Sequence, residues 1–216
     1  MKKTEPCAWV SRAFMNTMLV RYVTPEGNLS DPRWNDLRWL ADTMTRNQRG
    51  EALPAERFPA ELYGKYSLKK INKLPDFCDA LGYWVVSAAM ADVLRQFDLG
   101  RTSLYPTRVY QHDRKTPVEG EYYCLNFGER KASFLPDASP RAYKVYPNQD
   151  IWALTGDPRN DDLALSARAL EGVALWIEEP RFTMAFFLSD RLVTALRDAK
   201  LTRYLGLFRC RIIPEI

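Results

Sequence analysis

The amino-acid sequence predicts an α+β fold, in which a mixed or antiparallel sheet packs with a few helices and two similar strand–helix–strand units occur. One observation is composition: 46% of the 216 residues are apolar and 27% are charged, with six Trp, eleven Tyr and ten Phe, which is typical of a chain that forms a stable core. The others are an internal repeat and, between its two copies, a region rich in strand signals and prolines.

Two segments separated by 102 residues share one pattern. A short apolar run ends at Ser87 in the first copy and at Ser189 in the second, and apolar residues follow each serine at +3, +6 and +7. That spacing predicts one face of a helix with the serine as its N-cap. Strand-like runs follow at Leu104–Tyr110 and Leu207–Ile213. The sequence leaves open whether the copies arose by duplication or are two solutions to one packing problem.

Other elements follow from local signals. A partial third copy, Leu165-Ser166 with Leu170, predicts a short capped helix. The remaining predictions are a strand ending at Leu19–Val23, a turn over Pro25–Asn28, a helix over residues 31–47 with Asp31 as N-cap and Pro32 in its first turn, and strands at Tyr122–Phe127 and Ala142–Tyr146. We expect residues 1–75 to form an N-terminal strand and helix region packed on a main body of residues 76–216, in one compact unit.

The net charge of +4 is modest, and its excess lies in the first third of the chain, where Lys69, Lys70 and Lys73 are close together. We interpret these positive charges as ordinary solvated surface, and nucleic-acid binding is not expected. No apolar run is long enough for a secretory signal or a membrane span, so we expect a cytoplasmic protein without membrane contact. Four widely spaced cysteines indicate free thiols.

Common catalytic signatures are missing from the sequence. His112 is the only histidine, which disfavours His-rich metal sites, and neither Ser87 nor Ser189 lies in a G-x-S-x-G motif. No glycine-rich phosphate loop occurs. We therefore expect neither enzymatic activity nor a metal or cofactor. Two alternatives stay open: a small-molecule enzyme with a carboxylate, tyrosine and arginine site, and an adaptor subunit of a secretion system.

Several segments resemble a family of bacterial polymorphic-toxin immunity proteins, typified by a Myxococcus immunity protein and formerly catalogued as a domain of unknown function. The resemblance covers about residues 80–213 and is carried by Tyr83–Ser87, Leu94–Gly100, Tyr122–Phe127, Asp162–Ser166 and Phe186–Leu196. It implies a cytosolic antitoxin that binds and inhibits a cognate secreted toxin, and the expectation for that toxin is a nuclease effector of a type VI secretion system. The sequence does not identify the toxin or predict the oligomeric state.

If the resemblance holds, an inhibitor of a nuclease with a basic groove could present acidic loops to it. The residues that this hypothesis assigns to the partner are Asp157, Asp161, Asp162, Glu178 and Glu179, with Trp176 as an aromatic anchor. The competing interpretation is that Trp176 is a core residue and that the acidic side chains are only solvated.

Overall fold

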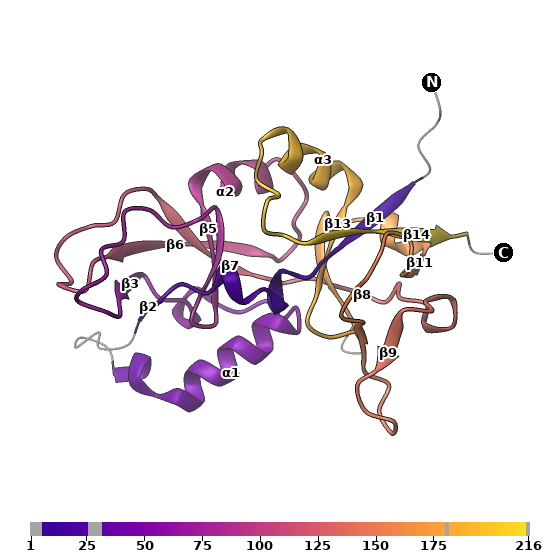
Figure 1. Cartoon of the computed structure of the whole chain (residues 1–216), viewed down its shortest axis with the longest axis horizontal. Helices are drawn as coiled ribbons and strands as arrows, with labels where there is room; N and C mark the ends of the chain where they lie inside the picture. Colours follow the sequence, from indigo (N-terminus) through magenta and orange to yellow (C-terminus); the bar gives the residue numbers. More distant parts are fainter. Residues whose placement is uncertain (1–5, 26–31, 180–181, 215–216) are drawn as a thin grey trace.

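A computed structural model describes residues 6–25, 32–179 and 182–214. The described residues form three α-helices and fourteen strands, most of them in two six-stranded sheets that lie side by side along the long axis of the molecule (Figure 1). The predicted α+β class is confirmed. No helix within the described ranges has the length and apolar character needed to cross a membrane.

The N-terminal sheet contains both strands that were predicted to flank the helix capped by Ser87. Its order is β2 (Val23–Thr24), β3 (Glu61–Gly64), β6 (Ser103–Tyr110), β7 (Tyr122–Asn126), β5 (Tyr83–Ser87) and β4 (Phe77–Ala80). The helix α2 (Ala88–Leu94) connects β5 to β6, and β7 lies between these two strands, antiparallel to both.

The C-terminal sheet is completed by a strand from the start of the chain. Its order is β11 (Ala164–Ser166), β14 (Leu207–Ile213), β1 (Cys7–Ser11), β13 (Phe186–Ser189), β12 (Leu175–Glu178) and β8 (Arg130–Lys131). The helix α3 (Asp190–Asp198) connects β13 to β14, and β1 lies between them, antiparallel to both. Residues 1–75 thus contribute to both sheets. The strands β9 (Ala142–Lys144) and β10 (Trp152–Leu154) form a separate hairpin.

The likeness of the two units extends beyond the predicted repeat. The orders β3-β6-β7-β5-β4 and β11-β14-β1-β13-β12 match strand for strand, and so does the direction of each pairing: the first pair is parallel and the next three are antiparallel. The difference is connectivity, because the central strand follows the unit as β7 in one case and precedes it as β1 in the other.

Both predicted cap serines occupy the positions that the sequence indicates. The Ser87 hydroxyl accepts a hydrogen bond from Met90 N at 3.3 Å, and the Ser189 hydroxyl accepts one from Leu192 N at 3.3 Å. The prediction for the third copy is wrong, since Ala167–Leu170 is a 3₁₀ turn and the Ser166 side chain makes no cap bond.

The helix predicted over residues 31–47 is α1 (Leu37–Gln48), so its predicted start is wrong. Asp36 is the N-cap, because its carboxylate accepts from Arg38 N at 2.9 Å and Trp39 N at 3.3 Å. Pro32 begins a preceding 3₁₀ turn. Residues 26–28 of the predicted turn and the predicted cap Asp31 lie outside the described residues.

The strand predicted at Leu19–Val23 is shorter in the structure. Residues 17–19 form a 3₁₀ turn, which Asn16 caps through Met18 N, and β2 begins at Val23.

The main core lies between the two units. The Phe14 ring stacks on Trp84 with 4.7 Å between centroids and meets Phe127 edge-on at 5.3 Å, while Phe127 lies 5.1 Å from Phe186. Helices α2 and α3 pack together above this cluster (Figure 1). A second cluster lies between α1 and the N-terminal sheet, and a third covers the opposite face of the C-terminal sheet.

A buried carboxylate lies in the third cluster. Glu178 is fully buried and accepts hydrogen bonds from Ser133 N at 2.8 Å, Phe134 N at 3.1 Å and Trp176 Nε1 at 2.9 Å, as well as from the Ser133 hydroxyl. Burial raises its pKa, against the effect of these donors. These bonds supply the partners that a buried carboxylate requires.

Lys131 covers this region from the side. Its ammonium lies 3.9 Å from the centre of the Trp176 ring and donates to the carbonyls of Ala169, Glu171 and Val173 at 2.6–3.2 Å. Burial lowers the pKa of Lys131 to about 8, because the neutral amine is easier to bury than the ammonium.

We predict that Ser189→Ala lowers the free energy of unfolding by about 1 kcal/mol, because an amide of α3 loses its cap. Ser166→Ala is the matched control. Ser166 follows a leucine as Ser189 does, but within the described residues its buried hydroxyl has no hydrogen-bond partner. We expect that control to change stability by less than about 0.5 kcal/mol. Urea denaturation measures both, and equal losses for the two variants would contradict the cap assignment.

A second prediction concerns pH. Between pH 8 and 10.5 the unfolded state holds the Lys131 proton more tightly than the folded state, so this group makes folding more favourable as pH rises through that window. Lys131→Met removes the titration. The unfolding free energy of the wild type minus that of the variant should therefore increase from pH 8 to 10.5. A difference that is constant across this window would show that Lys131 keeps an ordinary pKa.

Candidate functional site

The serines and the histidine do not form a nucleophile–base pair. Besides its cap bond, the Ser87 hydroxyl donates to Asp76 at 2.7 Å, and Ser87 is buried. His112 Nδ1 instead lies 3.1 Å from the carbonyl oxygen of Gly64. Across the described segments, no group of three or more His, Cys, Asp or Glu side chains is arranged to hold a metal ion.

A carboxylate, a tyrosine and an arginine do meet at one place near His112. The Tyr63 hydroxyl donates to Glu61 at 2.5 Å, and the Arg114 guanidinium lies 5.1 Å from the centre of the Tyr63 ring. Burial, followed by the bond to Glu61, raises the pKa of Tyr63 to about 12. A phenol with that pKa stays protonated near neutral pH, so Tyr63 is poorly suited to act as a general base there.

Two of the six residues assigned to partner binding lie inside the protein. Trp176 and Glu178 are both 0% exposed, because β12 is buried along its whole length and the two side chains bond to each other. In this conformation neither can contact a partner. The interpretation of Trp176 as a core residue is therefore the one that the structure supports, and Glu178 is a structural carboxylate and not a surface acid.

The other four acidic residues lie at or near the surface, but they do not form one group. Asp157, Asp161 and Asp162 share a loop beside β14, whereas Glu179 follows β12, and β1 and β13 separate those two strands. Asp161 is already paired with Arg209, with Oδ1 2.9 Å from Nε. Asp162 accepts from Arg159 N at 2.6 Å. These contacts hold the loop in place, and the role of the four residues in partner binding stays a prediction.

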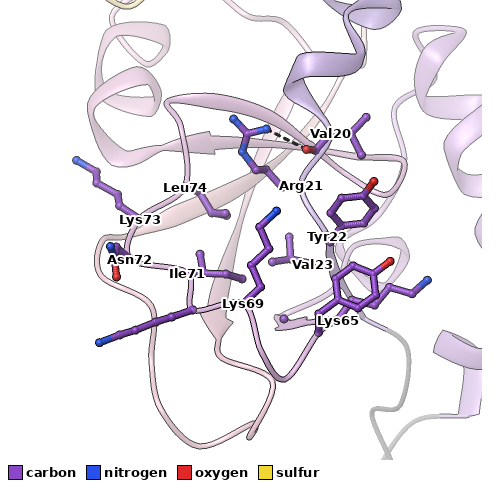
Figure 2. Close-up of a pocket in the computed structure, with 13 residues that line it drawn as sticks. Val20, Arg21, Tyr22, Val23, Lys65, Lys69, Ile71, Asn72, Lys73 and Leu74 are labelled. Carbon is purple, nitrogen blue, oxygen red and sulfur yellow. Dashed lines mark hydrogen bonds between the residues drawn. The ribbon is translucent and has the colours of Figure 1, made fainter.

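A hollow with a different charge lies at the edge of the N-terminal sheet. We call it the basic hollow; it has a volume of about 350 Å³ and is lined by residues 20–23, 64–66 and 69–74 (Figure 2). These segments contain no acidic residue and carry five cations, namely Arg21, Lys65, Lys69, Lys70 and Lys73. Among the described residues, none of the five forms an ion pair.

The local structure explains how these cations come together. In the pairing of β2 with β3, Val23 lies opposite Gly64 and Thr24 lies opposite Tyr63. Lys65 N also donates to Tyr22 O at 2.9 Å. The segment with Arg21 and Tyr22 is therefore fixed beside the segment that begins at Lys65. Figure 2 shows Lys69 reaching across the hollow toward Tyr22, with Lys65 and Lys73 on opposite sides.

Aromatic side chains lie among these charges. Tyr22 and Tyr66 are 46% and 48% exposed, their ring centroids are 5.2 Å apart, and the Lys69 ammonium lies 5.6 Å from the centre of the Tyr22 ring. Tyrosine and arginine are both enriched in protein interfaces. The cluster Lys69, Lys70 and Lys73 was visible in the sequence and was interpreted as solvated surface, whereas no local pattern links it to Arg21.

The whole-chain comparisons agree with the resemblance seen in single segments. The model of the Imm11 immunity protein family matches residues 21–204, which includes every residue of the basic hollow except Val20. No curated protein matches the sequence significantly. Because the family model spans most of the chain, including α1, α2 and α3, this protein belongs to the Imm11 immunity protein family.

Proposed function

We propose that this protein is an antitoxin that binds one cognate secreted toxin and inhibits it inside the producing cell. The observation that carries the proposal is the match to an immunity protein family over residues 21–204. The finer parts of the proposal are that the toxin takes part in competition between bacteria, that it is a nuclease effector of a type VI secretion system, and that the antitoxin acts in the cytoplasm.

The proposed mechanism is occlusion. The cap serines stabilise helices and the large aromatic residues fill the core, so the side chains that stand out in the sequence serve the scaffold. A rigid scaffold can hold a tight interface, since binding then requires little ordering of the chain. Covering the active site of the toxin would be enough to stop turnover, without any chemical step by the inhibitor.

The enzyme alternative would use a carboxylate, tyrosine and arginine group such as Glu61, Tyr63 and Arg114. The raised pKa of Tyr63 makes proton abstraction by its hydroxyl unfavourable near neutral pH. No contact in the described structure specifically favours the adaptor alternative. Inhibitory binding is therefore the function that we carry forward.

The test is neutralisation of the product of the adjacent toxin gene. We predict that its expression alone stops growth, that co-expression of this protein restores growth, and that the purified proteins form a complex with nanomolar Kd. Such affinities are common for protein inhibitors. A noncognate immunity protein serves as the control. Growth arrest that persists on co-expression, with no complex at micromolar concentrations, would contradict the proposed function.

A further inference from the structure

We propose that the basic hollow is the docking site for an acid-rich loop of the cognate toxin. The inference rests on the proposed function and deepens it, because it names the face that binds and the chemistry of the partner. It assigns the contact to a surface opposite in charge to the acidic loops considered from the sequence.

The first argument is charge. The five cations of the hollow exceed the net charge of +4 for the whole chain, so all other residues together carry a slight negative charge. The screening length in physiological salt is about 8 Å, so cations gathered around one hollow act together on an approaching partner. A local positive surface on an otherwise nearly neutral protein favours and orients the approach of an acidic surface.

The second argument is the apolar rim. Leu68 is fully exposed between Tyr66 and Lys69, and Met18 is 71% exposed close to Arg21, whose guanidinium donates to Met18 O at 2.8 Å. With the exposed rings of Tyr22 and Tyr66, these side chains gather around one hollow, and grouped exposed apolar side chains mark interaction sites where single ones do not. A partner that covers them gains from burial as well as from charge.

The third argument is that the backbone of the hollow is already fixed. Ile71 N donates to Gln111 Oε1 at 3.0 Å, and Ile71 O accepts from Gln111 Nε2 at 2.5 Å. Leu74 N donates to the Tyr122 hydroxyl at 2.9 Å. Arg21 N donates to Asp79 O at 2.7 Å. Because the backbone of the hollow is bonded to strands β4 and β7 and to the residue after β6, a partner has to order mainly side chains.

The chemistry of the surface favours a protein over a nucleic acid. A nucleic acid would follow a stripe of positive charge across the molecule, whereas these cations are confined to one edge and the remaining surface is slightly negative. Phosphates would also leave Leu68 and Met18 uncovered. An acidic loop that carries apolar side chains as well satisfies both features.

The test compares two triple charge reversals. Lys69→Glu with Lys70→Glu and Lys73→Glu changes the hollow, and Lys115→Glu with Lys144→Glu and Lys200→Glu is the matched control, which makes the same change in net charge at exposed sites elsewhere. Affinity for the toxin is measured by calorimetry. We expect the hollow variant to bind at least about 100-fold more weakly, since like charges would then face each other, and the control to bind within threefold of wild type.

A second variant tests the two exposed tyrosines of the hollow and guards against misfolding. Tyr22→Ala with Tyr66→Ala keeps every charge, and we expect at least a tenfold faster dissociation with an unchanged dependence of association on salt. Thermal unfolding checks that all three variants stay folded. A hollow variant that is folded and binds the toxin within threefold of wild type would overturn the proposed docking site while leaving the proposed function intact.

Two further outcomes are distinguishable. If the wild-type protein itself does not bind the toxin, the proposed function fails and the docking site fails with it. If the wild type binds a single-stranded RNA 20-mer, and the hollow variant loses that binding but still binds the toxin, then the hollow is a nucleic-acid site and the inference is wrong.

Discussion

The fold depends on the packing of two sheets against one shared aromatic cluster. Trp84 comes from the N-terminal sheet, Phe127 directly follows strand β7 of that sheet, Phe186 comes from the C-terminal sheet, and Phe14 from the segment between β1 and β2. Large aromatic side chains contribute most of the burial energy at such contacts. The two units therefore share one hydrophobic core, to which both sheets and helices α2 and α3 contribute.

The strand β1 adds a second constraint of the same kind. It pairs on both sides, with Trp9 opposite Leu188 in β13 and opposite Arg209 in β14. The start of the chain is thereby fixed within the unit formed by its end. The chain then crosses to the other sheet through residues 12–22, so the segment that carries Arg21 and Tyr22 leaves one sheet and enters the other at a defined place. The basic hollow forms where that segment meets residues 64–74.

Local sequence signals predicted those elements whose stabilising contacts are close in sequence. The two Ser-led helices, the strand after each, and the bounds of β14 follow from spacing and N-cap chemistry, and the structure has them where the sequence indicates. The place of β1 could not be predicted, because its partners in β13 and β14 lie about 180 and about 200 residues away and its own pattern carries no sign of them. Glu178 was misassigned for a related reason: its donors at Ser133 and Phe134 are distant in sequence. The sequence alone showed the clustered lysines of the hollow but not Arg21, since the pairing of β2 with β3 brings Arg21 beside them.

The central claim is that this protein acts through a preformed surface and not through a reactive group. Amide hydrogen exchange with and without the toxin tests it most directly, because it reports which backbone segments become protected. We predict slower exchange in residues 20–24 and 64–74 when the toxin is bound, with little change in residues 157–162. Protection confined to residues 157–162 and the end of β12, with residues 64–74 unchanged, would contradict this account.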